Sequence, residues 1–154
     1  MEESVRKETY LAGQLFRQLF EKYNRLENKK NLYKDLKDLT LIEINTIIVI
    51  GIHERKSMSE IANQLGVSFG TPTVTIDRLI GKGLVERIRD EEDRRQVFIK
   101  LSETGSKVHQ SVIEIRKRVT EAIFGILSPE ERTSLVSILS KLNNHFDDFF
   151  MDMK

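Results

Sequence analysis

The positions of apolar residues divide the chain into stretches with helical spacing and one stretch that alternates. From Leu15 to Leu26, apolar residues recur every three or four positions with charged residues between them, which predicts a long amphipathic helix. The polar segment that follows breaks this spacing and predicts a connector. Thr40 and Glu43 then have the spacing of a capping box, so we expect a second helix from Thr40 to about His53.

Two helices separated by a tight turn come next. Ser57 opens a second capping box, and Gly66 can adopt the left-handed conformation that closes a helix. The following helix must begin between residues 68 and 71, because Pro72 lacks an amide hydrogen and is tolerated only in a first turn. It should end in the Gly-Lys-Gly segment 81–83. A short helix, a turn and another helix is the order of a helix-turn-helix.

After this helix, the spacing of apolar residues changes from the helical period to a period of two residues. Residues 84–89 and 96–101 alternate apolar and polar side chains, and six consecutive charged residues from Asp90 to Arg95 separate the two runs. This pattern predicts a β-hairpin with a charged tip.

Two long helices complete the predicted order of elements. A stripe of branched apolar residues runs from Val108 to Ile126 behind the cap Ser102. Ser128 and Pro129 are strong start signals for the last helix. The predicted fold class is therefore mainly α with a small β-hairpin wing, a winged helix-turn-helix between long N- and C-terminal helices.

The second helix of the helix-turn-helix carries a surface that suits DNA. At about 100° per residue, Thr71, Val74, Thr75, Arg78 and Lys82 fall within one stripe roughly 100° wide. Their hydroxyls, methyl groups and cations match base edges, thymine methyls and phosphates in a major groove. An ordinary surface helix with the same residues is the alternative, and the stripe alone does not separate the two.

The charged tip of the hairpin favours DNA as the partner. In a winged helix the tip enters the neighbouring minor groove, where an arginine such as Arg95 meets a negative potential. Asp93 lies two residues away and can orient the guanidinium by a charge-assisted hydrogen bond. A charged tip that only keeps an exposed hairpin soluble is the alternative. The residues predicted to contact DNA are Ser68, Thr71, Thr73, Val74, Thr75, Arg78, Lys82, Asp93, Arg94 and Arg95.

Composition limits the function without indicating a partner. The chain has 154 residues, of which 39% are hydrophobic and 32% charged, and a formal net charge of +1, as expected for one domain, or one domain with an arm that needs a partner. There is no cysteine, so disulfides, thiolate catalysis, thiol redox sensing and Cys-type zinc sites are excluded. The N-terminal region has no signal-like apolar segment, and the most apolar window, 41–52, is too short for a membrane span. We expect a cytoplasmic protein without a membrane partner.

Catalytic and metal sites are not predicted. The three histidines, His53, His109 and His145, include no pair at the i, i+4 spacing that binds a metal on a helix. No arrangement of serine, histidine and acid, or of paired carboxylates, stands out. We therefore expect no cofactor, no metal and no enzymatic activity.

Four segments resemble the MarR family of bacterial winged-helix transcriptional regulators: MSEIANQLGVS, DRLIGKGLVER, DEEDRRQVFIKLSETG and LSPEERTSLVSILSKL. The wing fits the family pattern through Asp93, Arg95, Leu101, Ser102 and Gly105, with serine in place of the usual threonine, which keeps the helix cap. The resemblance implies DNA binding by the helix after the turn and by the wing arginine, which the wing aspartate orients.

A second resemblance concerns the branch of the family. The segment SFGTPTVT, with Gly70, Thr71 and Thr73, is most similar to the branch that represses fatty-acid biosynthesis genes and responds to acyl chains on carrier protein. It implies an acyl-carrier protein, or a small molecule, as the effector.

The family resemblance also implies a homodimer formed by the N-terminal helix and the two C-terminal helices. Their apolar stripes indicate the same, because a small central domain cannot cover them and a monomer would expose a large apolar patch. The expected organisation is an N-terminal dimerisation helix and connector over 1–39, a winged helix-turn-helix DNA-binding domain over 40–101, and C-terminal dimerisation helices over 102–154. The residues expected in the dimer interface are Leu15, Phe16, Leu19, Phe20, Leu135, Leu139, Leu142, Phe146 and Phe149.

Together, the patterns and the resemblance predict a homodimeric regulator, more a repressor than an activator, that binds double-stranded DNA at a pseudo-palindromic operator and is modulated by a ligand. A winged-helix module that contacts another protein and has no operator is the competing hypothesis. Replacing Arg78 and Arg95 by alanine would separate the two, because a protein-contact module would keep its function in an assay without DNA.

Overall fold

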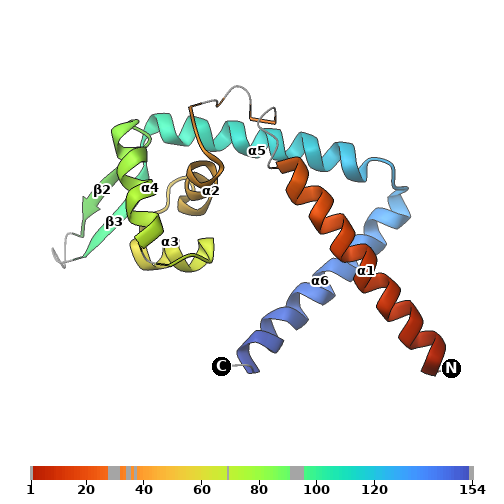
Figure 1. Cartoon of the computed structure of the whole chain (residues 1–154). Helices are drawn as coiled ribbons and strands as arrows, with labels where there is room; N and C mark the ends of the chain where they lie inside the picture. The colour runs from red at the N-terminus through yellow and green to blue at the C-terminus, as the bar shows by residue number, and fades with distance from the viewer. Residues whose placement is uncertain are drawn as a thin grey trace. The chain divides into compact units, whose positions relative to one another are not determined.

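The computed structural model describes residues 2–27, 32–33, 36, 38–68, 70–90 and 96–152, whose helices and wing strands follow the predicted order (Figure 1). The mainly α winged helix-turn-helix predicted from the sequence is confirmed. The elements are α1 (Glu2–Glu27), α2 (Leu41–Ile50), β1 (Lys56–Ser57), α3 (Met58–Leu65), α4 (Gly70–Gly81), β2 (Val85–Arg89), β3 (Val97–Leu101), α5 (Glu103–Phe124) and α6 (Pro129–Asp152).

The chain divides into two compact units, Met1–Ile115 and Arg116–Lys154. The first contains α1, the helix-turn-helix, the sheet and the first part of α5, and the second contains the rest of α5 and α6. The three-part organisation expected from the sequence stays a prediction. Among the described residues, no helix combines the length and the apolar character that crossing a membrane requires.

Helices α2 and α3 begin at the caps that the sequence predicts. The Thr40 hydroxyl oxygen accepts a hydrogen bond from the Glu43 amide, and the Glu43 carboxylate accepts one from the Thr40 amide at 2.7 Å. Ser57 forms the same reciprocal pair with Glu60, and Gly66 closes α3 at φ 64°, as predicted. Because these caps satisfy amides that a first turn leaves unpaired, the limits of α3 are determined locally.

Two predicted helix ends are wrong. α2 ends at Ile50 and not near His53, because Gly51 has φ 79° and leaves the helical region. α5 ends at Phe124, so Ile126 does not extend its apolar stripe; Ile126 lies in the turn before α6 and is 85% exposed. In both places a glycine directly follows the last helical residue and interrupts an apolar run that a count of periodicity continues.

The wing hairpin belongs to a three-stranded antiparallel sheet with the order β1-β3-β2. Val85 of β2 lies opposite Leu101 of β3, and the pairing continues outward along both strands. β1 pairs with the other side of β3, at Phe98 and Ile99. The sequence predicts only the hairpin strands, because a strand of two residues is too short to show an alternation.

One hydrophobic core joins the helix-turn-helix to the sheet. Its apolar side chains come from α2, α3, α4 and the strands, and Ile47, Ile61, Ile76, Leu79 and Ile99 are all fully buried. Truncating a side chain of this kind to alanine costs about 2–5 kcal/mol of folding free energy. Because Ile76 and Leu79 turn α4 toward this core, the opposite face of α4 is directed outward.

The sheet is joined closely to the start of α5. The hydroxyl of Ser102, the predicted cap, accepts a hydrogen bond from the Gly105 amide at 3.0 Å and donates one to the Gly83 carbonyl at 2.7 Å. The Ser102 amide donates to the Leu84 carbonyl at 3.0 Å. A Cβ atom built on Gly105 would lie 1.9 Å from the same Leu84 oxygen, so this position has no room for a side chain.

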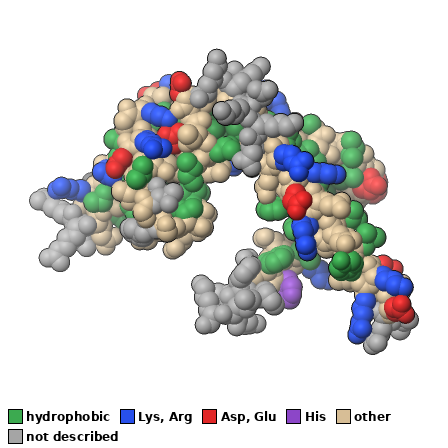
Figure 2. All heavy atoms as spheres, in the orientation of Figure 1, with side chains coloured by type: hydrophobic (Ala, Val, Ile, Leu, Met, Phe, Trp, Pro, Cys, Tyr) green, Lys and Arg blue, Asp and Glu red, His purple; other side chains and the backbone are tan. Residues whose placement is uncertain are grey.

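Helices α1 and α6 carry large apolar side chains on their surfaces. Figure 2 shows hydrophobic side chains among the lysines and arginines of α1. Of the predicted dimer residues on α6, Leu135 is half-buried and the side chain of Phe149 lies outside the described part of the chain. So many exposed apolar side chains indicate that another protein surface covers these helices. The exposed predicted residues, each 42–55% accessible, are Leu15, Phe16, Leu19, Phe20, Leu139, Leu142 and Phe146.

Candidate nucleic-acid interface

Helix α4 lies beside the hairpin of β2 and β3 (Figure 1). Its solvent-exposed face carries side chains of different kinds. Val74 is 53% exposed, and Thr73 and Arg78 are exposed as well. Within the described residues, the Arg78 guanidinium has no ion-pair partner. A hydroxyl, a branched apolar group and a cation can meet a base edge, a thymine methyl and a phosphate. The structure thus brings three of the predicted DNA-contacting residues to one surface.

The other residues predicted to contact DNA from α4 and the turn before it do not all share this exposure. Thr75 is only 5% exposed, so its placement on the outward stripe is wrong. A stripe drawn from sequence spacing puts Thr75 at the edge of the face, and the packing of Ile76 and Leu79 against the core turns that edge inward. Ser68 is exposed just before the helix, and the side chain of Thr71 lies outside the described part of the chain.

The outward face of α4 also contains an acid that the sequence stripe omitted. Asp77 is one turn from Thr73 and Val74, and its carboxylate lies 2.6 Å from the Arg87 guanidinium of β2. Both side chains are about half exposed. This ion pair links the helix to the wing strand and offsets a negative charge that would otherwise repel phosphate. Asp77 and Arg87 are ten residues apart, and only the packing of α4 against β2 makes them neighbours.

Lys82, directly after α4, is held by acceptors inside the protein. Its ammonium lies 2.8 Å from the carboxylate of Glu43, whose side chain is 2% exposed, and it also donates a hydrogen bond to the Asp38 carbonyl. Burial raises the pKa of Glu43, but the hydrogen bonds from Lys82 and Thr40 outweigh burial and leave this pKa below its ordinary value. We therefore leave Lys82 out of the proposed DNA contacts.

The C-terminal end of α4 is closed by a Schellman turn. The Leu84 amide donates to the Leu79 carbonyl at 2.9 Å, and the Gly83 amide donates to the Ile80 carbonyl at 2.8 Å. Gly83 has φ 70°, a conformation that glycine adopts without a steric penalty. The predicted helix end in the Gly-Lys-Gly segment is confirmed, and the turn leads the chain directly into β2.

An arginine that the sequence did not single out contacts the wing hairpin near its outer end. The Arg55 guanidinium lies 3.0 Å from the carboxylate of Asp90 and 4.7 Å from the centre of the Phe98 ring. It thereby joins the segment before β1 to the residue that follows β2 by an ion pair, and to β3 by a cation–π contact. Arg55 is distant in sequence from both partners, so no local pattern marks it.

The tip of the wing lies outside the described residues. Asp93, Arg94 and Arg95 belong to it, so their predicted contacts with a minor groove stay predictions. The hairpin is closed beneath the tip, where the Asp90 amide donates to the Gln96 carbonyl at 3.1 Å.

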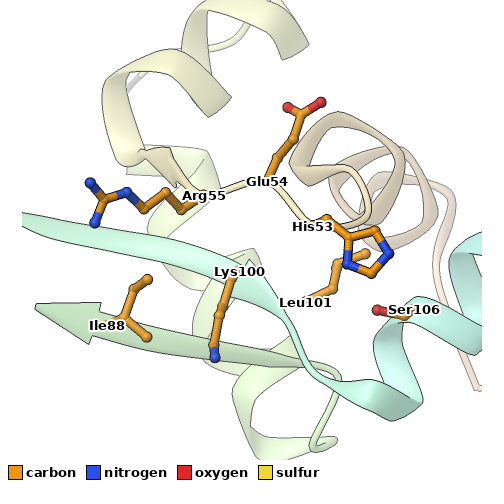
Figure 3. A pocket seen from close by; sticks show the side chains of 7 residues that line it. All are labelled: His53, Glu54, Arg55, Ile88, Lys100, Leu101 and Ser106. Atoms are coloured by element: carbon orange, nitrogen blue, oxygen red, sulfur yellow. The ribbon is translucent and has the colours of Figure 1, made fainter. Parts of the chain in front are cut away.

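A pocket of about 340 Å³ lies between the segment after α2, the sheet and the first turn of α5 (Figure 3). Its two long cations have carboxylate partners, since Arg55 pairs with Asp90 and Lys100 lies 3.2 Å from Glu86. Each of these charges is therefore balanced by a carboxylate in β2 or directly after it. Across the described part of the chain, no group of three or more acidic or histidine side chains could hold a metal ion. The pocket is lined by His53, Glu54, Arg55, Ile88, Lys100, Leu101 and Ser106.

Comparison with known proteins agrees with this geometry. The model of the MarR family matches residues 39–97, from the start of the helix-turn-helix region into the wing. The HTH-type transcriptional regulator YpoP of Bacillus subtilis is 30% identical over 121 residues, which are 79% of this chain and 85% of YpoP.

Two similar solved structures contain DNA. FabT of Streptococcus pneumoniae in complex with DNA has a TM-score of 0.77 and 29% identity, over 91% of this chain and 98% of that one. A mutant MarR from E. coli complexed with operator DNA has a TM-score of 0.64 and 26% identity, over 84% of this chain and 91% of that one.

Proposed function

The chain belongs to the MarR family of transcriptional regulators, and on that premise we propose that it is a repressor that binds a pseudo-palindromic DNA operator as a homodimer. The observation that carries this proposal is the outward face of α4, where Thr73, Val74 and Arg78 are exposed on the helix that packs against the wing strand β2. The similar folds of FabT and MarR, both solved with DNA, support it.

In this proposal α4 enters the major groove. Thr73 and Arg78 contact base edges or phosphates, and Val74 packs against a thymine methyl group. Ser68 lies just before α4 and Thr71 in its first turn, where a phosphate also meets the positive end of the helix dipole. Asp77 is kept from repelling the backbone by its ion pair with Arg87.

The wing supplies the second contact. Arg95 enters the adjacent minor groove, Asp93 orients its guanidinium, and Arg94 contacts the phosphate backbone. Arg55 supports this role because it contacts both Asp90 and Phe98, near the outer end of the described hairpin.

The homodimer is formed by α1, α5 and α6. Its support is the exposed apolar side chains of α1 and α6, which a second copy would cover. Two-fold symmetry then places two α4 helices on half-sites about one turn of DNA, or about 34–36 Å, apart.

The proposed regulator acts in the cytoplasm and responds to a ligand. The resemblance of the α4 segment around Gly70, Thr71 and Thr73 to the fatty-acid branch of the family supports control of fatty-acid biosynthesis genes. An acyl-carrier protein, or a small molecule, is the corresponding effector. This part of the proposal rests on one short segment and is tested after an operator has been found.

The test is fluorescence anisotropy with the DNA upstream of the protein's own gene. A shuffled duplex of equal length and composition is measured at the same salt concentration, because phosphate contacts make any affinity salt-dependent. We expect the native duplex to bind more tightly by about two orders of magnitude or more, as specific regulators do. Acyl-carrier protein is then titrated into the complex.

Each other outcome has a definite meaning. Equal, weak and salt-sensitive binding to both duplexes would contradict repression of the protein's own gene and direct the search to a remote operator. No binding to either duplex at low salt would contradict the proposed function and favour a winged-helix module that contacts protein.

A further inference from the structure

The pair Lys82–Glu43 connects parts of the domain that are far apart in the chain. Lys82 directly follows α4, and Glu43 lies in the first turn of α2, 39 residues earlier. The Glu43 carboxylate uses one oxygen for Lys82 at 2.8 Å and the other for the Thr40 amide and hydroxyl, at 2.7 and 2.9 Å. The Lys82 ammonium has a second acceptor, the Asp38 carbonyl. One carboxylate therefore joins the end of α4, the start of α2 and the chain before α2.

Because Glu43 is buried, its carboxylate depends on the donors that surround it. A charged carboxylate that is almost wholly removed from water is stable only when its oxygens are paired. Here both oxygens have donors, and the Lys82 side chain is itself two-thirds covered, at 35% exposure. A displacement of the end of α4 that the Lys82 side chain cannot follow would leave a buried charge without its cation, which is strongly destabilising.

The apolar contacts of α4 restrict the helix in another way. Ile76 and Leu79 hold α4 against the core by close packing, and the Lys82–Glu43 pair adds a polar contact at the C-terminal end of the helix. Base contacts need donor–acceptor distances of about 2.7–3.2 Å and good alignment, whereas attraction to phosphates acts over a longer range. A small shift of α4 therefore weakens binding to the correct sequence more than binding to DNA in general.

We propose that Lys82 and Glu43 are positioning residues that set the sequence specificity of α4 by fixing its C-terminal end to α2 and to the chain before α2. The inference rests on the proposed binding of α4 to an operator. It assigns Lys82 an indirect role, in place of the phosphate contact that its position at the end of the outward stripe suggests.

The test is the Lys82→Met variant, which keeps most of the side-chain length and removes the ammonium. Operator affinity should fall about tenfold, while affinity for a shuffled duplex changes by less than about twofold. The slope of log affinity against log salt should stay as in the wild type. A lost phosphate contact would instead reduce the slope by about 0.9 for each contact and weaken both duplexes equally.

Glu43→Gln provides a second variant that does not depend on Lys82. Glu43 is buried and cannot touch DNA, and glutamine can still act in the capping box. It should lower operator preference as Lys82→Met does, and Lys82→Met should add little in the Glu43→Gln background, because the two residues act through one contact.

The matched control is Lys107→Met on α5. Lys107 also pairs with a glutamate, Glu103, at 2.7 Å, but both side chains are well exposed. The charge change is the same, so operator preference should remain at the wild-type level. Thermal unfolding of every variant identifies a temperature at which all are folded, and binding is compared there.

The outcomes separate this inference from the proposed function. If the wild type prefers its operator and either Lys82→Met or Glu43→Gln leaves that preference intact, the positioning role is overturned and the proposed function stands. A reduced salt slope in Lys82→Met, with equal loss on both duplexes, overturns it in favour of a phosphate contact. A wild type without any preference among candidate operators overturns both, because α4 would then have no operator on which to be positioned.

Discussion

At the scale of single residues, Arg78 is the cation on the outward face of α4 whose loss should be most informative. We expect Arg78→Ala to weaken operator binding by roughly 1–3 kcal/mol, the range for a good specific contact. Arg132→Ala, an exposed arginine in the first turn of α6, removes the same charge outside α4 and should bind as the wild type does. Anisotropy titrations at one salt concentration measure both, and equal affinities would remove Arg78 from the interface.

Glu43 gives the folding free energy a defined dependence on acid pH. Its pKa is raised by burial but lowered on balance by its hydrogen bonds with Lys82 and Thr40, to below the ordinary value of 4.5. The unfolded chain therefore takes up this proton at a higher pH than the folded chain. The stabilisation is fully present above the unfolded pKa and is lost as pH falls through the lowered folded pKa.

Urea unfolding measured at several pH values tests this dependence. Between neutral pH and the lowered pKa, the free energy of unfolding should fall more steeply for the wild type than for Glu43→Gln. Carboxylates common to both proteins cancel in the difference between the two curves. Parallel curves would show that Glu43 titrates alike in the folded and unfolded chains.

Residue-level predictions succeeded where spacing along one helix was sufficient. Val74 and Arg78 are exposed as the helical stripe predicts. Thr75 was misplaced because the edge of a stripe is decided by what packs beside it, and that information lies in other segments. The partner of Lys82 was missed for the same reason, since Glu43 precedes it by 39 residues.

At the scale of elements, the start of α5 depends on the absence of a side chain at Gly105. We expect Gly105→Ala to destabilise the protein by about 3 kcal/mol, the upper end for over-packing, because its Cβ would lie 1.9 Å from the Leu84 carbonyl oxygen and the backbone must move. Gly13→Ala, in α1 with no atom near its Cβ, is the control and should not destabilise the chain. Urea midpoints compare the two variants. A small loss of stability in Gly105→Ala would mean that the start of α5 can move away from the Leu84 carbonyl.

The limits of elements were predicted where local chemistry decides them. The caps at Thr40, Ser57 and Ser128 depend on residues three positions away, and all three helices begin there. The strand β1 and the early end of α2 depend instead on β3 and on the backbone conformation of Gly51. Neither leaves a periodic signal in the sequence.

At the scale of the whole molecule, the apolar surfaces of α1 and α6 predict the state of assembly. Sedimentation equilibrium should give twice the chain mass of 17.9 kDa for the wild type. Leu139→Glu places a charge among the exposed apolar side chains of α6 and should shift the mass toward the monomer, since burying an unpaired carboxylate is strongly unfavourable. Ser59→Glu, at an exposed position on α3 outside the proposed dimer helices, introduces the same charge and should remain dimeric. A monomeric wild type would refute the proposed assembly.

The three-stranded part of the wing sheet has a mechanical consequence for the hairpin. At Phe98 and Ile99, β3 is held on both sides, by β1 and β2, whereas at Val97 the described residues pair it with β2 alone. Arg55 reinforces the boundary at Phe98. The hairpin is therefore held on both sides as far out as Phe98, and a small rotation at this residue displaces the hairpin beyond it in proportion to the distance from Phe98. The rigidity of the three-stranded part of the sheet therefore determines how closely the direction of the hairpin is fixed.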